Sequence, residues 1–175
     1  MKVEQDLNDQ MFRAFYKGKI WKVLNINLLS EHCNLMYLSY DDDDVDDDDE
    51  TEPESEIETS VKFAWFRDIY DSYDYIDTDE YAVIMQNTFK RHSDGKYVRG
   101  NIFEGDLLVV KNQDLEDEDE EETHALFVAL PDKDLGWVLA TDDNDEKLAL
   151  SKIQTENLFL IGNVFTYHEP GYNGN

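Results

Sequence analysis

The sequence of 175 residues has little cysteine and little positive charge. Its single cysteine, Cys33, excludes an internal disulfide framework, and its four histidines lack the spacing of a zinc site. Lysine and arginine number 15 against 42 aspartates and glutamates, which gives a formal net charge of −27. This charge disfavours binding to nucleic acids and to anionic membranes, because both are themselves negative.

Long apolar runs are also absent. No run reaches the roughly 18 residues that a membrane-spanning helix needs, and the first residues do not resemble a signal peptide. We therefore expect a soluble protein of the cytoplasm.

Two segments hold much of the acid. Residues 41–58 contain thirteen acidic residues without a lysine or arginine, and residues 114–122 contain eight more. Outside them 21 acidic residues face all 15 basic ones, so the rest of the chain is only mildly acidic. Blocks of like charge repel and cannot bury apolar surface. The sequence therefore predicts two long acidic loop insertions, at 41–60 and 112–123.

Short apolar runs between turn signals predict a mostly β fold. Turns are expected at Lys17-Gly18, Ser93–Lys96 and Gly105-Asp106. Strands are expected at 11–15, 20–28, 35–38, 61–66, 81–85, 107–110, 125–130, 136–140 and 158–165. We predict an N-terminal β element over 1–80, a second domain over 81–170 and a frayed tail at 171–175.

A third acidic stretch differs from the insertions because apolar residues interrupt it. Its aspartates recur at every third position from residue 68, which would place several of them near one face of a helix. One interpretation is a solvated helix face. The other is an ordered array of carboxylates that docks on an Arg- and Lys-rich surface. The candidate partner-binding residues are Asp68, Asp71, Asp74, Asp77, Asp79, Glu80, Tyr70 and Tyr73.

The sequence carries no enzyme signature. Residues 104–110 are similar to a strand of LexA-type self-cleaving peptidases, but the serine and lysine of that catalytic dyad have no counterpart. We expect no enzymatic activity, no metal and no cofactor. One basic cluster, around Gly95, is either a small nucleic-acid patch or a set of counter-charges for the acidic body. Its members are Lys90, Arg91, Lys96 and Arg99.

Three motifs follow one another in a characteristic order: Phe12–Phe15, then Met85–Thr88 with Ile102–Asp106, and finally Leu160–Phe165. Together they resemble the YopX family of phage and prophage proteins, over roughly residues 11–170. The resemblance implies a phage-encoded protein with an SH3-like β-barrel in its C-terminal half and a smaller N-terminal β (α+β) element. The expected cytoplasm is then that of the infected or lysogenic host cell. It implies no chemistry. This chain departs from the family pattern at Phe15, at Asn87, in the extra residues 98–101 and in the acidic insertions.

These observations predict a non-enzymatic accessory protein that binds a host protein with a basic surface. A nucleic-acid-binding or defence protein is the natural target, since carboxylates compete for the Lys and Arg groups that meet phosphates. Such a protein would act as a DNA mimic and would not contact nucleic acid or membrane itself. The alternative is a structural, homo-oligomeric β module whose acidic loops keep it soluble.

Overall fold

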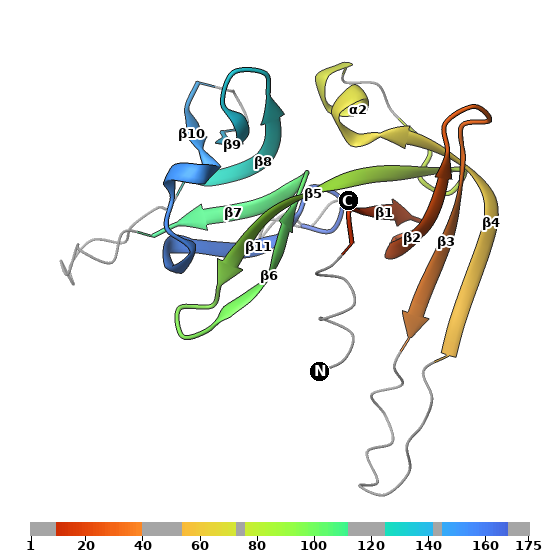
Figure 1. The fold of residues 1–175 in the computed structure, drawn as a ribbon, viewed down its shortest axis with the longest axis horizontal. Helices are drawn as coiled ribbons and strands as arrows, with labels where there is room; N and C mark the ends of the chain where they lie inside the picture. The colour runs from red at the N-terminus through yellow and green to blue at the C-terminus, as the bar shows by residue number, and fades with distance from the viewer. Residues whose placement is uncertain (1–9, 40–53, 73–75, 112–124, 142–144, 168–175) are drawn as a thin grey trace, which may run out of the picture. The chain divides into compact units, whose positions relative to one another are not determined.

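The structure, a computed structural model, describes residues 10–39, 54–72, 76–111, 125–141 and 145–167. They form eleven strands, one α-helix and two 3-10 helices (Figure 1), which confirms the mostly β prediction. None of the described helices is long and apolar enough to cross a membrane. The elements are β1 (Phe12–Tyr16), β2 (Lys19–Asn27), β3 (His32–Ser39), β4 (Glu54–Trp65), α2 (Phe66–Ser72), β5 (Tyr81–Ser93), β6 (Val98–Phe103), β7 (Asp106–Val110), β8 (Leu126–Asp132), β9 (Gly136–Ala140), β10 (Lys147–Ala149), η1 (Leu150–Lys152), η2 (Thr155–Asn157) and β11 (Leu158–Asn163).

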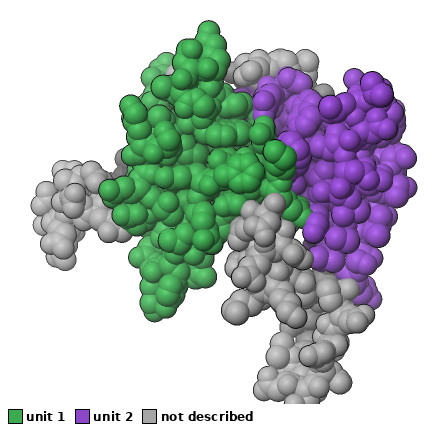
Figure 2. All heavy atoms as spheres, in the orientation of Figure 1, with its two compact units in different colours: residues 1–11, 85–175 green, residues 12–84 purple. Residues whose placement is uncertain are grey.

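The chain divides into two compact units (Figure 2). Unit 2 comprises residues 12–84, and unit 1 comprises residues 1–11 and 85–175. The division falls inside β5, so the first part of this strand belongs to unit 2 and the remainder to unit 1. The boundary predicted from the sequence, 80/81, lies where the turn leads into the same strand.

In unit 2 five strands pair into a ring. β1 to β4 form an antiparallel meander, β4 runs parallel to β5, and β1 pairs with β5 as well as with β2. α2 lies in the crossover that the parallel pair requires. Every strand of the ring contributes to one core cluster, formed by Ala14, Tyr16, Trp21, Cys33, Leu35, Val61, Ala82 and Ile84.

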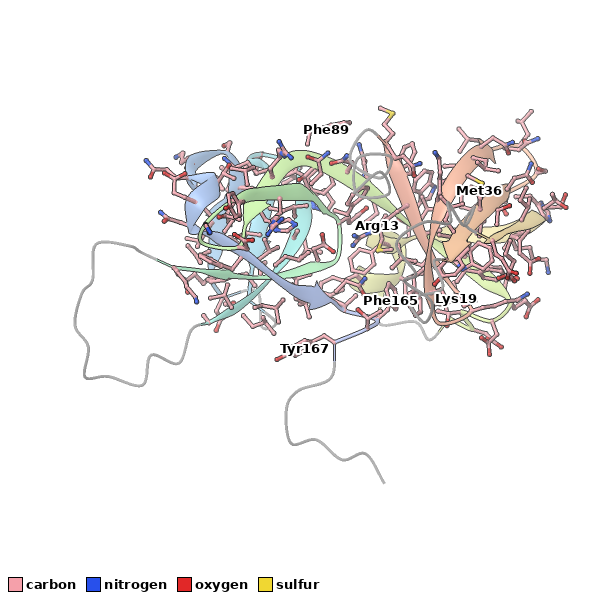
Figure 3. The ribbon with its side chains drawn as sticks, turned by 90° about the horizontal axis from the view of Figure 1, so that it is seen from below. Arg13, Lys19, Met36, Phe89, Phe165 and Tyr167 are labelled. Carbon is pink, nitrogen blue, oxygen red and sulfur yellow. The ribbon has the colours of Figure 1, made fainter. Side chains whose placement is uncertain are left out.

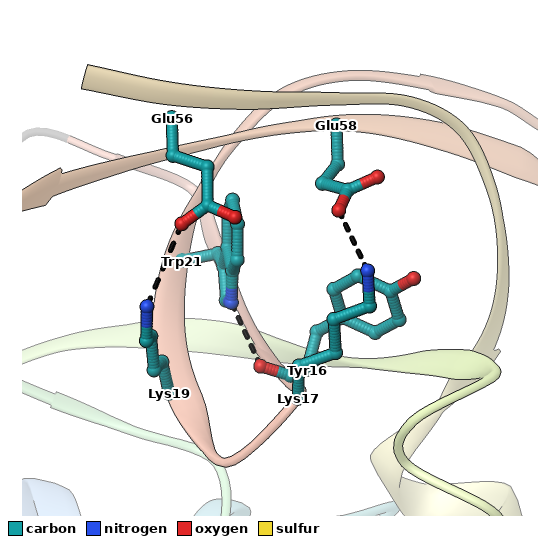
Figure 4. Close-up of polar contacts among 6 residues, drawn as sticks. All are labelled: Tyr16, Lys17, Lys19, Trp21, Glu56 and Glu58. Atoms are coloured by element: carbon teal, nitrogen blue, oxygen red, sulfur yellow. Dashed lines mark hydrogen bonds and ion pairs between the residues drawn. The ribbon is translucent and has the colours of Figure 1, made fainter.

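The β1–β2 hairpin confirms the turn predicted at Lys17-Gly18. These residues have φ angles of 48° and 74°, and two successive positive φ angles are typical of the type I′ turn that suits a two-residue hairpin loop. Trp21 Nε1 donates a hydrogen bond of 2.7 Å to the carbonyl oxygen of Tyr16, which satisfies the buried indole (Figure 4). The two rings also meet edge to face, with centroids 5.8 Å apart.

β4 corrects the predicted insertion at 41–60. Its residues 54–60 are strand, and most of them pair with β3. Two lysines of the β1–β2 hairpin compensate glutamates of this part of β4. Lys17 Nζ lies 2.7 Å from Glu58 Oε1, and Lys19 Nζ lies 3.5 Å from Glu56 Oε2 (Figure 4). The prediction failed because counting charge along the chain ignores cations that a neighbouring hairpin supplies.

The other residues of the two predicted insertions, 41–53 and 112–123, lie outside the described residues. The predicted tail at 171–175 lies outside them as well. Of the two predicted insertions, the structure therefore tests only residues 54–60.

In unit 1 the pairings of the described strands follow an open path, β6-β5-β11-β7-β8-β9-β10. All neighbours are antiparallel except β5 and β11, which run parallel and pair at Ser93 and Phe159. The core of this unit consists of Ile102, Leu108, Phe127, Ala129, Leu139, Leu150 and Leu158. An SH3-like barrel over 81–170 stays a prediction.

The turn predicted at Gly105-Asp106 is present, and it is buried. Gly105 has a φ of 80°, a conformation that favours glycine. Asp106 Oδ2 accepts the backbone N–H of Phe103 at 2.8 Å, and Glu104 Oε2 accepts that of Gln86 at 3.2 Å. Both carboxylates are buried and bind backbone groups, so they stabilise the connection between β6 and β7.

Candidate functional site

The predicted acidic site lies at the α2 crossover of unit 2. Asp68 is in the first turn of α2, whereas Asp77, Asp79 and Glu80 share the turn that leads into β5. The structure therefore brings three of the predicted residues together and leaves Asp68 at the start of the helix. α2 ends at Ser72; Tyr73, Asp74 and the side chain of Asp71 lie outside what the structure describes.

The turn before β5 fixes the carboxylate of Asp77 and the backbone of the residues that follow it. Asp77 Oδ1 accepts the N–H of Asp79 at 3.0 Å, and the Asp77 carbonyl oxygen accepts the N–H groups of Glu80 and Tyr81. The N–H of Lys17 donates to the carbonyl oxygen of Thr78 at 2.9 Å, which ties the turn to the β1–β2 hairpin. Asp77 and Asp79 are thus exposed on a backbone that is fixed from two sides.

The members of this turn differ in their charge partners. Lys62 Nζ lies 3.4 Å from Glu80 Oε1, so Glu80 is compensated within unit 2. Asp77 and Asp79 form no ion pair with any residue that the structure describes. Their negative charge is therefore directed to solvent.

Tyr70, another predicted binding residue, is involved in the packing of α2. Its ring stacks on Phe66 with centroids 5.4 Å apart and an interplanar angle of 27°. Phe66 is buried, and Tyr70 itself is half-buried. A role for Tyr70 in partner binding stays a prediction.

Much of the remaining charge is balanced. Besides the pairs of Glu56, Glu58 and Glu80, Lys147 Nζ lies 3.5 Å from Asp132 Oδ2. The described residues include all but one of the basic residues but fewer than half of the acidic ones. Exposed pairs add little stability, but they cancel the local field. Asp77 and Asp79 are therefore two neighbouring carboxylates that no described cation compensates; Asp134 and Glu146 are likewise exposed and form no ion pair with a described residue.

The basic cluster lies on the β5–β6 hairpin of unit 1, where Asp94 organises it. Arg99 Nε donates to Asp94 Oδ2 at 2.6 Å, and Asp94 Oδ1 accepts the N–H groups of Tyr97 at 2.7 Å and Lys96 at 2.9 Å. These two backbone donors, followed by Arg99, lower the pKa of Asp94 to about 2. Arg99 is thus a counter-charge within the hairpin, which favours that interpretation over a nucleic-acid patch.

Unit 1 also contains a pocket of about 460 Å³ that the sequence does not predict. It opens between the end of β5, the end of β7 and the bulged part of β11, three segments that are far apart in the sequence. No local pattern could have indicated it. Its lining residues are His92, Ser93, Asp94, Val109, Lys111, Phe159, Leu160 and Ile161.

No group of three histidine, cysteine or acidic side chains among the described residues is arranged to hold a metal ion. Cys33 is buried in the core of unit 2, and burial raises the pKa of its thiol to about 11. A thiol in this environment is protonated at neutral pH, because the thiolate loses its hydration.

No protein-family model matches the chain, and no curated protein matches it. A similar solved structure is the crystal structure of protein EF1440 from Enterococcus faecalis, which is 15% identical. The match covers 89% of this chain and 93% of that chain with a TM-score of 0.45. A likeness at this level carries no argument about function, and membership of the YopX family stays a prediction.

Proposed function

We propose that this chain acts without chemistry, by placing the carboxylates of the α2–β5 turn on a basic surface of a partner protein. One observation carries the proposal: Asp77 and Asp79 are exposed, are held by the hydrogen bonds of their turn and have no cation partner among the described residues. The Asp77 carboxylate and the backbone of the turn are fixed in advance. They therefore lose little conformational freedom on binding, so more of the interaction energy contributes to affinity.

The partner that suits this turn is a host protein with a basic surface, such as a nucleic-acid-binding or defence protein. An arginine fork that binds phosphate also binds a carboxylate through two parallel hydrogen bonds. The turn would therefore compete with DNA as a mimic. The net charge of −27 adds a long-range attraction that weakens as salt is raised. A phage origin, a cytoplasmic location and an SH3-like barrel over 81–170 belong to the same proposal.

A second candidate function, a homo-oligomeric structural module, is favoured by exposed apolar side chains of unit 2. Ile57 on β4 is 58% exposed and lies directly opposite Met36 on β3. Leu29, between β2 and β3, is 99% exposed. Ile57 lies on a strand and Leu29 in a turn. Exposed apolar groups are typical of surfaces that associate when they form a contiguous patch.

Affinity capture with matched baits tests the proposal. The site variant carries Asp77→Asn and Asp79→Asn; the asparagine at position 77 keeps an acceptor for the N–H of residue 79. The control variant carries Asp134→Asn and Glu146→Gln, which remove two exposed charges from unit 1. We expect the wild-type and control baits to capture the same basic, salt-eluted host protein from lysate and the site variant to lose it. Equal capture by all three baits would contradict the proposal. Capture of the chain alone would support the oligomeric module.

A further inference from the structure

The pocket of unit 1 forms where two neighbours of β11 part. β5 and β11 pair at Ser93 and Phe159, and after this contact β5 turns into the hairpin loop. On the other side β11 pairs with β7, but its register shifts between Leu160 and Gly162. A β-bulge of this kind bends the strand locally. The opening of about 460 Å³ falls within the range of ~300–1,000 Å³ typical of small-ligand sites.

The walls of the pocket are largely apolar. Phe159 supplies an aromatic ring, Val109 a buried aliphatic group, and Leu160 and Ile161 are 37% and 46% exposed. Gly95 keeps the ring edge of Phe159 uncovered by a neighbouring side chain, because a Cβ at that position would lie only 3.4 Å from Phe159 Cε1. An apolar ligand group of moderate size can therefore pack on this ring and on the two exposed aliphatic side chains.

Of the two charged side chains at the pocket, Asp94 has a cationic partner among the described residues and Lys111 has no anionic one. Lys111 Nζ lies 4.7 Å from the centroid of the Phe159 ring, close enough for a cation–π contact. It forms no ion pair with a described residue. Asp94, the acidic residue of the lining, is already neutralised by Arg99 and by two backbone N–H groups. Among the described residues, the pocket therefore combines an apolar surface with one positive charge, that of Lys111, which no carboxylate pairs.

We propose that this pocket binds a small organic monocarboxylate with an aromatic or branched aliphatic body. The carboxylate meets the ammonium group of Lys111, and the apolar body packs on Phe159, Leu160 and Ile161. A charge-assisted hydrogen bond supplies orientation, and burial of the apolar body supplies most of the affinity. This site lies within unit 1 and does not depend on the acidic turn of unit 2, so either proposal can fail without the other.

A titration of the full chain, followed by amide NMR, tests the proposal with three probes. The probes are 3-phenylpropanoate, its neutral amide and acetate. We expect 3-phenylpropanoate to shift the amide signals of Gly95, Lys111 and residues 159–161, the neutral amide to bind about fivefold more weakly, and acetate to cause no localised shift. Equal binding of acid and amide, shifts confined to another region, or no shift at millimolar 3-phenylpropanoate would each overturn the proposal.

Variants of Lys111 separate a specific contact from general attraction to a cation. Lys111→Met keeps an apolar stem over Phe159 but removes the charge, whereas Lys111→Arg keeps the charge. We expect about a fivefold loss of 3-phenylpropanoate affinity for Lys111→Met, little change for Lys111→Arg, and none for Lys133→Met, which removes an exposed cation elsewhere in unit 1. Unchanged binding by Lys111→Met would overturn the assignment of the carboxylate to this side chain.

Discussion

Asn87 Oδ1 accepts the backbone N–H of Phe89 at 2.7 Å and thereby holds a phenylalanine in the left-handed conformation, with a φ of 59°. Asn87 is buried, and its Nδ2 donates to the carbonyl oxygen of Gln10 at 2.8 Å. The β5–β6 ladder shifts register between Asn87 and Arg91, so the pair lies in a β-bulge. The Phe89 side chain, 60% exposed, points away from the ribbon (Figure 3).

Phe89→Gly is expected to stabilise the protein. A non-glycine residue in the left-handed region costs about 1–2 kcal/mol, and part of that gain is lost to the greater freedom of glycine in the unfolded chain. We expect a net increase in the free energy of unfolding of about 0.5–1 kcal/mol, measured by urea denaturation. Phe89→Ala is the control, because it removes the ring without relieving the backbone. An equal stability gain for Phe89→Ala and Phe89→Gly would show that the backbone of Phe89 is not strained.

Asn87→Ala is expected to destabilise the protein by about 2–3 kcal/mol, because it leaves the N–H of Phe89 and the carbonyl oxygen of Gln10 without their side-chain partner. The same denaturation experiment measures this change. Asn25→Ala, at an exposed position of β2, is the control and should change stability by no more than about 0.5 kcal/mol. A cost for Asn87→Ala as small as that of the control would show that the bulge does not depend on Asn87.

Asp94 is expected to make folding stability depend on pH in the acid range. Its pKa in the folded protein is about 2, below the ordinary value of 3.8, so the unfolded chain binds the proton more tightly. The stabilisation is therefore complete above the ordinary value and is lost as the pH falls towards 2. Unfolding should be measured from pH 5 to pH 2 for the wild type and for Asp94→Asn. The difference in free energy of unfolding between the two proteins should shrink as the pH falls. A difference that stays constant would contradict the lowered pKa of Asp94.

Cys33 is expected to resist thiol reagents in the folded protein. Burial within unit 2 limits access and raises the pKa of the thiol to about 11, so little thiolate is present at pH 8. Modification by a disulfide reagent should be slow in buffer and fast in concentrated urea, which serves as the control for reactivity. Rapid, complete modification in buffer would place Cys33 at an accessible surface instead.

Period-two patterns and turn residues were sufficient to predict most of the strands. The hairpins at Lys17-Gly18 and between β8 and β9 are present because their signals are local: residues that tolerate positive φ between two short apolar runs. β4 was predicted too short because its N-terminal part is acidic, and the lysines that compensate it belong to another hairpin.

The candidate sites were less predictable than the strands. The sequence indicated acid around residues 68–80, but it could not show that Glu80 pairs with Lys62 while Asp77 and Asp79 do not, since that depends on which strands are neighbours. Nor could it indicate the bulge at Phe89 or the pocket at Lys111. Both depend on the register of strands that are distant in the sequence.

The most direct test of the central claim is the affinity of the full chain for an arginine-rich peptide, measured at several salt concentrations for the wild type, the site variant and the control variant. The two variants lose the same amount of charge. The account predicts that the site variant binds at least about fivefold more weakly than the control variant and has the smaller salt dependence. Equal affinities for the two variants would mean that only total charge matters, and would contradict a specific acidic site at the α2–β5 turn.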